Sequence, residues 1–332
     1  MRIRAVTVFS NSLNQDTIHQ LHQKLMDIDM DLFSRRISLP PSTNVNLGRI
    51  LDILPDDKSV LFSLGGLFDH DPRIVDIPDV LRSGDNIFVH ILLRDNRNMD
   101  NAVKVLSKLE PDEASRFAIL LNEEFLTTPY YPASSGDNFH LGFGLSLIYV
   151  KEVLGNLMEE ALMEAKRKGQ EIEEKIGLKF LGIDPSVSPW MEESVGHLLE
   201  TKLGKKIYSP GVLSVISNMN NNIMRASINT DVNAMGFSEL MIPVAEDNIL
   251  KERVLEGRVT LSHLLNMSSA CLAGLDMVGV NYEQGLYFNI ISDLIIIQRL
   301  KKRPYGIRII PSYGEEKIDT KNFGTVPVVK TI

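Results

Sequence analysis

The chain has 332 residues, of which 44% are hydrophobic and 23% are charged, a composition typical of globular proteins. This length is enough for one large α/β domain or for two smaller ones. The formal net charge of -8 argues against a nucleic-acid-binding protein, which needs a basic face.

In the first half of the chain, short runs of branched apolar residues alternate with segments whose apolar residues recur at helical spacing. Strands are predicted at residues 3–9, 37–39, 60–64, 87–93 and 117–121. Helices are predicted at residues 16–32, 71–82 and 99–108, and residues 127–138 are predicted to form an irregular loop. Strands that alternate with helices predict a mostly parallel sheet with right-handed crossovers.

A continuous helix is predicted from residue 149 to 176, because Val150, Val153 and Leu162 belong to one apolar stripe. We expect this stripe to cover the sheet, although it could also face a second subunit. Strands are then predicted at residues 178–183, 240–244, 275–280, 307–310 and 324–329. Further helices are predicted at residues 191–203, 211–228, 247–255, 261–269 and 284–300. The basic run R-L-K-K-R at 299–303 is expected to end the last helix, where cations stabilise the negative end of the helix dipole.

Four motifs in the second half each combine an apolar strand with an acid, a serine or a proline. They are K-F-L-G-I-D-P-S-V-S-P (179–189), G-F-S-E-L-M-I-P-V-A-E-D-N (236–248), C-L-A-G-L-D-M-V-G-V (271–280) and Y-G-I-R-I-I-P (305–311). Side chains at the carboxyl ends of strands usually line the ligand site of an α/β protein. The motifs therefore predict a pocket, but they contain no catalytic signature.

Six motifs in combination are typical of one protein family. They are M-R-I-R-A-V-T-V, T-P-Y-Y-P-A-S, G-F-S-E-L-M-I-P-V-A-E-D-N, A-C-L-A-G-L-D-M-V, I-R-I-I-P and F-G-T-V-P-V. On these motifs, which extend over most of the chain, the protein resembles the domain of unknown function (DUF) family 711. The better-known members are longer, which implies that this chain is a compact variant.

That family is similar in fold to the glycyl-radical enzymes typified by pyruvate formate-lyase. The similarity implies a ten-stranded α/β barrel made of two five-stranded parallel halves, antiparallel to each other, with helices outside. Residues 1–332 would then form one domain with halves at 1–170 and 171–332. The same similarity suggests a radical role for Cys271 with Gly324. The tail lacks the arginine-framed motif of those enzymes, however, so we expect Cys271 to be a buried, unreactive thiol.

Asp184 ends a predicted strand and is followed by a proline-stiffened loop that contains Ser186 and Ser188. A carboxylate with two hydroxyl groups could orient a polar ligand or help to hold a metal through oxygen ligands. The alternative is a turn with a helix cap, since Ser188 followed by Pro189 is a favourable start for a helix. We expect Ser188 to be the cap and Asp184 to face the site.

Asp276 and Arg308 each interrupt an apolar strand. A carboxylate in such a strand must be paired, hydrogen-bonded, protonated or directed at a polar cavity, because its desolvation is costly. Asp276 is therefore either an active-site acid or the partner of a buried arginine such as Arg308. A pair of this kind could itself bind an anion through its guanidinium group.

Two further segments supply binding candidates. Glu246 precedes a predicted helix, where an acid either stabilises the positive helix end or binds a ligand. The loop at 127–138 carries Tyr130, Tyr131 and Ser134, and adjacent tyrosines between prolines can close over a small ligand. They could equally be packing residues.

These features predict a small-metabolite-binding α/β-barrel protein with a polar or anionic ligand. If it is an enzyme, we predict acid–base chemistry by Asp184 or Asp276 without an organic cofactor; the sequence identifies neither a cofactor nor a set of metal ligands. The alternative is a non-catalytic ligand sensor or an assembly subunit that uses the same pocket.

The expected partners are a small molecule and further copies of the chain in a homo-oligomer, with neither nucleic acid nor membrane. A single cysteine fits the reducing cytoplasm. The N-terminal segment is too short and too alternating for a signal peptide. The apolar run at 294–297 is far shorter than a membrane span.

Overall fold

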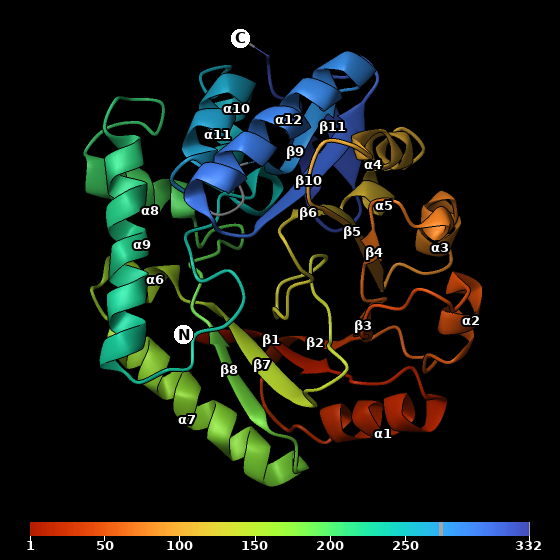
Figure 1. The fold of residues 1–332 in the computed structure, drawn as a ribbon. Helices are drawn as coiled ribbons and strands as arrows, with labels where there is room; N and C mark the ends of the chain where they lie inside the picture. Colours follow the sequence, from red (N-terminus) through yellow and green to blue (C-terminus); the bar gives the residue numbers. More distant parts are fainter. Residues whose placement is uncertain (272–274, 332) are drawn as a thin grey trace.

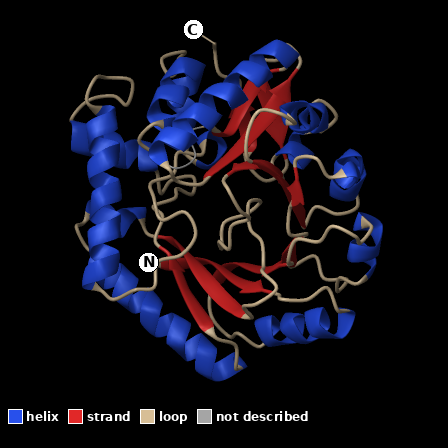
Figure 2. Cartoon of the chain, in the orientation of Figure 1, coloured by secondary structure: helices blue, strands red, loops and turns tan. Residues whose placement is uncertain are grey.

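The computed structural model describes residues 1–271 and 275–331, so the Leu272–Gly274 part of the third motif lies outside the described residues. Ten strands form one mixed, mostly parallel sheet, and the helices lie around its outside (Figures 1 and 2). Figure 1 shows that the sheet curves, with β1, β2, β7 and β8 on one side and β5, β6, β9 and β10 on the other. The loop that follows β6 enters the space between these two sides.

The first half of the chain builds a parallel run in the order β1-β2-β3-β5-β6, with β4 paired to β5. Its strands are β1 (Arg2–Phe9), β2 (Leu32–Ser38), β3 (Val60–Ser63), β4 (Leu67–Phe68), β5 (Ile87–Leu93) and β6 (Phe117–Leu121). Its helices are α1 (Gln15–Met26), α2 (Leu47–Asp52), η1 (Pro72–Asp76), α3 (Ile77–Arg82), α4 (Met99–Leu106) and α5 (Pro111–Ala114). Parallel neighbours require such crossover connections, which explains the alternation in the sequence.

The chain from residue 142 onward adds two parallel pairs, one at each end of this run. Its strands are β7 (Gly142–Ile148), β8 (Phe180–Asp184), β9 (Asp276–Asn281) and β10 (Tyr305–Ser312), and β11 (Lys317–Thr320) and β12 (Gly324–Pro327) form a separate hairpin. Its helices are α6 (Val150–Leu154), α7 (Met158–Ile176), α8 (Val195–Leu203), α9 (Val212–Asn229), η2 (Val244–Glu246), α10 (Asn248–Leu255), α11 (Leu261–Ser268) and α12 (Gln284–Lys301). The β7–β8 pair joins β1 antiparallel, and the β9–β10 pair joins β6 antiparallel.

The sheet is not closed into a barrel. The strands β8 and β9 end the strand order, and no ladder joins them in the described part of the chain. The strand predicted at residues 240–244 is wrong, because this segment is irregular and passes into the 3-10 helix η2. Pro243 has no N–H group for a ladder, and the Leu240 N–H donates to the Asn220 side chain (2.8 Å).

Two predictions around α7 are wrong. We missed β7, in which Gly142 and Gly144 interrupt the apolar pattern; each lies against a neighbour that leaves no room for a Cβ atom. The predicted continuous helix at 149–176 is two helices, separated near Gly155 and Asn156, which has φ 59°. The core role of its stripe is confirmed for Val150, Val153 and Leu162, which are buried.

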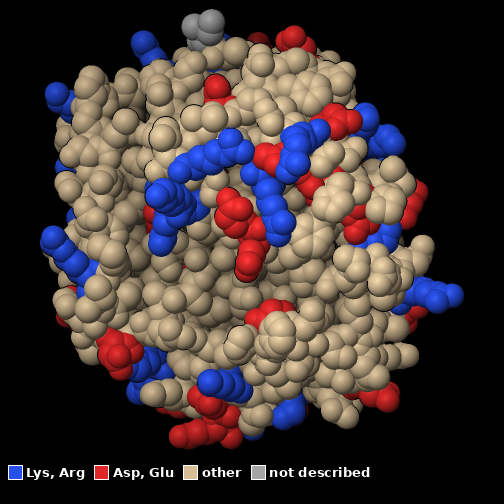
Figure 3. All heavy atoms as spheres, in the orientation of Figure 1, with Lys and Arg blue, Asp and Glu red and all other residues tan. Residues whose placement is uncertain are grey.

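The basic run at 299–303 closes α12 as predicted, with Arg299 and Lys301 in its last turn. Figure 3 shows Lys and Arg side chains over the end of α12 in this view, with acidic side chains beside them. Within the described ranges, no helix is both long and apolar enough to cross a membrane.

Candidate functional site

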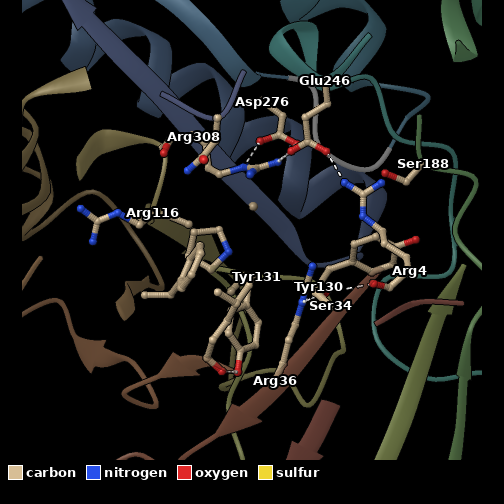
Figure 4. Close-up of a pocket in the computed structure, with 18 of the residues that line it drawn as sticks. Arg4, Ser34, Arg36, Arg116, Tyr130, Tyr131, Ser188, Glu246, Asp276 and Arg308 are labelled. Carbon is tan, nitrogen blue, oxygen red and sulfur yellow. Dashed lines mark hydrogen bonds and ion pairs between the residues drawn. The ribbon is translucent and has the colours of Figure 1, made fainter. Parts of the chain in front are cut away.

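A cavity of about 400 Å³ lies against the inner side of the curved sheet (Figure 4). Its charged lining residues come from strands, loops and η2, and they are Arg4, Arg36, Asp85, Arg116, Glu246, Asp276 and Arg308. Large apolar side chains cover much of the remaining wall, and they are Phe33, Phe88, Trp190, Phe237, Met241 and Phe323. A concave, mostly apolar site with a few charged groups is typical of small-molecule pockets.

Two arginines and two carboxylates form a connected row on this wall (Figure 4). Arg308 donates from Nη2 to Asp276 Oδ2 (2.9 Å) and to Glu246 Oε1 (2.9 Å), and its Nε also donates to Asp276. The other oxygen of Glu246 accepts from Arg4, which also donates to the Pro189 carbonyl (2.8 Å). All four side chains are at most 13% exposed. The pair of Asp276 with Arg308, one of the two alternatives for Asp276, is therefore present.

The strands explain why Asp276 and Arg308 meet. They occupy neighbouring positions on the parallel strands β9 and β10. The register of the two strands shifts directly after this pair, and Met277 has φ 51°. An irregularity of this kind redirects side chains and is frequent next to functional sites.

The two carboxylates differ in their pKa. Burial alone would raise the pKa of Glu246. The charges and hydrogen bonds of Arg308 and Arg4 outweigh burial, so the pKa of Glu246 lies below its ordinary value. Burial raises the pKa of Asp276 above its ordinary value, and Arg308 only partly offsets this. Glu246 is therefore the permanent anion of the row, and Asp276 is the group that takes up a proton more readily.

Arg4 and Arg36 are site residues that our reading of the sequence missed. Arg36 lies on β2 and is 7% exposed. It donates to Ser34 Oγ (3.0 Å) and to the Pro129 carbonyl (2.9 Å), and its guanidinium carbon lies 5.0 Å from the centre of the Tyr131 ring. Burial and the nearby Arg4 lower the pKa of Arg36 to about 10, so it remains charged at neutral pH. The sequence signal for Arg4 is an arginine that alternates with apolar residues in the strand predicted at 3–9, whereas Arg36 directly precedes the strand predicted at 37–39.

The loop at residues 127–138, which carries Tyr130 and Tyr131, supplies part of the cavity wall. Tyr130 and Tyr131 both line the cavity, and burial raises the pKa of each phenol well above its ordinary value. The Tyr131 hydroxyl accepts from Ser38 Oγ (3.1 Å). Ser134 lies behind the wall, where its carbonyl accepts from Ser63 Oγ (2.6 Å). The tyrosines are thus placed to contact a ligand, and Ser134 anchors the loop.

Asp184 and Ser186 are not on the cavity wall. The Asp184 carboxylate is fully buried and accepts five hydrogen bonds, from Thr128 Oγ1, both donors of Ser186, and the N–H groups of Phe237 and Ser238. Gly236 allows this wrapping, since it has φ 67° and an added Cβ atom would lie 2.3 Å from Asp184 Oδ2. This geometry favours a structural role for Asp184 over the acid–base role that the sequence suggested.

The prediction that Ser188 caps a helix is wrong. The helix α8 begins at Val195, and Ser194 caps it by accepting from the His197 N–H (2.9 Å). Ser188 lies instead on the cavity wall. The helix-end role considered for Glu246 belongs to its neighbour Asp247, which caps α10 through the N–H groups of Ile249 and Leu250.

The tip of the β11–β12 hairpin also reaches the cavity, through Asn322 and Phe323. The ring of Phe323 lies 6.1 Å from that of Trp190, and its carbonyl accepts from Lys251 Nζ (2.7 Å). The neighbouring Lys321 forms an ion pair with Asp85 (3.2 Å). The tip is therefore anchored on both sides.

Cys271 is buried, as expected, and burial raises the pKa of its thiol to about 12. Gly324 begins β12, and neither residue lines the cavity. Within residues 1–271 and 275–331, no group of three or more His, Cys, Asp or Glu side chains is arranged to hold a metal ion.

The fold places the chain among mixed α/β proteins with one large, mostly parallel sheet. A profile of the family described as "Uncharacterised ACR (DUF711)" matches residues 142–324, more than half of the chain. The chain belongs to this family.

Relatives with the name UPF0210 protein occur in archaea and bacteria. The chain is 33% identical to that of Sulfurisphaera tokodaii over 147 residues, which are 43% of this chain and 33% of the relative. It is 28% identical to that of Pyrobaculum aerophilum over 250 residues (66% and 54%) and 23% identical to that of Lacticaseibacillus casei over 283 residues (75% and 61%). The chain thus spans about half the length of the curated relatives it matches.

Proposed function

We propose that the chain binds a small polar or anionic metabolite in this cavity and acts on it by acid–base chemistry at Asp276. The observation that carries the proposal is the connected row of two arginines and two carboxylates on a largely apolar cavity wall. Burying charge is costly, and a packed core would be as stable without it. A charged row beside a cavity is therefore more useful for binding and chemistry than for stability.

The difference in pKa between Glu246 and Asp276 supports the choice of Asp276 as the acid–base group. Catalytic acids and bases are found where neighbouring groups have pKa values that are pushed apart. Glu246 stays ionised and fixes both arginines, whereas the raised pKa of Asp276 brings it closer to the neutral range in which a general acid or base works. The backbone irregularity at Met277, next to Asp276, fits a position held for function.

A non-catalytic ligand sensor or assembly subunit is the second candidate. The observation that favours it is that both oxygens of Asp276 accept hydrogen bonds from Arg308, which would suit a purely binding role. A sensor would change its oligomeric state or its affinity for a partner when the ligand binds. An enzyme would release a product.

The test begins with a thermal-shift screen against metabolites, because a ligand that binds only the native form raises the melting temperature. Turnover of each stabilising compound is then measured with the wild type, with Asp276→Asn and with Asp293→Asn, a control at an exposed position on α12. We expect Asp276→Asn to keep its fold but to lose turnover by roughly 10²–10⁴-fold. Wild-type turnover by Asp276→Asn would contradict the proposal.

The architecture and assembly are proposed on separate grounds. We propose that residues 1–332 form one domain, in which the sheet is an open form of the two-half barrel. The antiparallel junctions of β1 with β7 and of β6 with β10 support this proposal. Exposed Met224 and Ile228 on α9 support a homo-oligomer, and the single buried Cys271 is in keeping with a reducing cytoplasm.

A further inference from the structure

Arg36 differs from the other arginines of the cavity wall. Arg4 and Arg308 pair with Glu246, Arg308 also pairs with Asp276, and Arg116 lies 3.8 Å from Asp85. In the described ranges of the chain, Arg36 forms no ion pair. A nearly buried guanidinium without a carboxylate is uncommon, because buried charges are normally paired.

The guanidinium of Arg36 retains donors that the protein does not use. Its Nε donates to Ser34 and its Nη1 donates to Pro129, but Nη2 has no protein acceptor within residues 1–271 and 275–331. Arg308 is similar: its Nε and Nη2 donate to the two carboxylates, and its Nη1 has no protein acceptor in the same part of the chain. Figure 4 shows Arg36 rising from β2 toward the part of the cavity that lies beneath Arg308.

The charges of the cavity wall do not balance. Four arginines line it (Arg4, Arg36, Arg116 and Arg308), but only three acids do (Asp85, Glu246 and Asp276). Arg4, Arg116 and Arg308 each lie beside one of these acids, so among the described residues Arg36 is the arginine of the wall that has no acid beside it. An anionic group of the ligand at this point would supply the missing counter-charge.

The surroundings of Arg36 restrict the rest of the ligand. Its guanidinium packs on the Tyr131 ring, and Phe88, Phe237 and Met241 line the same cavity. The Tyr131 ring and these three side chains offer aromatic and apolar contacts. These contacts favour a largely apolar body for the part of the ligand beyond its charged group.

We propose that the ligand of this cavity is a small monocarboxylate with an apolar body, whose carboxylate binds Arg36 and Arg308. Arginine suits this role because its planar fork matches the geometry of a carboxylate. The inference rests on the proposed function, since it uses the same cavity, and it specifies the ligand class and the residue that selects it.

The test uses matched acids and amides. Binding of phenylacetate, phenylacetamide, 4-methylpentanoate, 4-methylpentanamide and inorganic phosphate is measured by calorimetry and by thermal shift. The proteins are the wild type, Arg36→Gln, Arg36→Lys and the control Arg49→Gln, which removes a guanidinium from an exposed position on α2. Circular dichroism establishes that each variant is folded.

We expect the two acids to bind the wild type and the control, and the two amides to bind neither. Arg36→Gln should weaken binding of the acids by roughly 10- to 100-fold, the factor that corresponds to loss of a charge-assisted hydrogen bond. The affinity of Arg36→Lys for the acids should lie between those of the wild type and Arg36→Gln, because lysine retains the charge but not the planar fork of the guanidinium. If Arg36→Gln does not fold, the lysine variant and the acid–amide comparison still decide the question.

Four results would overturn the inference: amides that bind as tightly as acids, phosphate that binds more tightly than either acid, unchanged affinity in folded Arg36→Gln, or no binding of either acid. The proposed function fails differently. If the acids bind through Arg36 but no bound carboxylate is turned over, the ligand class stands and acid–base catalysis does not. If an uncharged compound is turned over through Asp276, acid–base catalysis stands and the proposed ligand class does not.

Discussion

Replacing Glu246 by glutamine removes the charge that two buried arginines share. Breaking a buried ion pair by removing one partner costs about 3–5 kcal/mol, because the other charge is left without compensation. The glutamine oxygen can still accept from Arg4 or from Arg308, so we expect a loss near the low end, about 3 kcal/mol of unfolding free energy. Urea unfolding at neutral pH measures this loss.

The control is Glu160→Gln, at an exposed position on α7, which should change stability by less than about 0.5 kcal/mol. The pH dependence gives a second check. Because the folded-state pKa of Glu246 lies below its ordinary value of 4.5, its contribution is fully present above about pH 4.5 and is lost as the pH falls through the folded-state pKa. The difference between the wild type and Glu246→Gln should therefore be constant near neutral pH and narrow in acid.

Asp276→Asn should cost less than Glu246→Gln. Its folded-state pKa is raised, so the ionised side chain is less favourable in the folded protein than in the unfolded one at neutral pH. A neutral amide avoids that cost. A loss in Glu246→Gln no larger than that of the control, or a larger loss in Asp276→Asn, would refute the assignment of the permanent charge to Glu246.

Three further predictions concern the walls and supports of the cavity. Gly236→Ala should lose more stability in urea unfolding than Gly204→Ala. Both glycines have φ 67°, so each substitution has a backbone cost of about 1–2 kcal/mol, but only at Gly236 would the added Cβ lie against Asp184. Equal losses would argue against the tight packing of the chain around the Asp184 carboxylate. Phe323→Ala should leave the fold intact and weaken ligand binding in calorimetry, because the hairpin tip then covers less of the cavity; unchanged affinity would place the ligand elsewhere. Cys271 should react with a thiol reagent at mildly alkaline pH only after unfolding, because burial raises its pKa to about 12, and rapid labelling of the native protein would contradict this.

Local patterns predicted many elements well. The strands at 87–93 and 117–121 match β5 and β6 because fully buried parallel strands read as continuous apolar runs. The pattern failed where tertiary contacts override it. In β7, the glycines that interrupt the apolar run permit close approach of neighbours, and in residues 240–244 a proline and the Asn220 side chain prevent pairing.

The site was only partly predictable for a related reason. Asp276, Arg308 and Glu246 stood out because they interrupt apolar segments or precede a helix. Arg4 did not, because an arginine at alternate positions of a strand is equally typical of a solvent-facing residue, and Arg36 did not, because it lies just before the strand predicted at 37–39. Alternation identifies a face of the sheet but does not reveal whether that face borders solvent or a cavity.

A crystal structure of the protein with bound phenylacetate would test the central claim most directly. We predict that the carboxylate lies in the cavity with an oxygen about 2.7–2.9 Å from Arg36 Nη2, the usual length of a charge-assisted hydrogen bond. A ligand bound outside the cavity, or inside it with the carboxylate directed away from Arg36, would contradict the account.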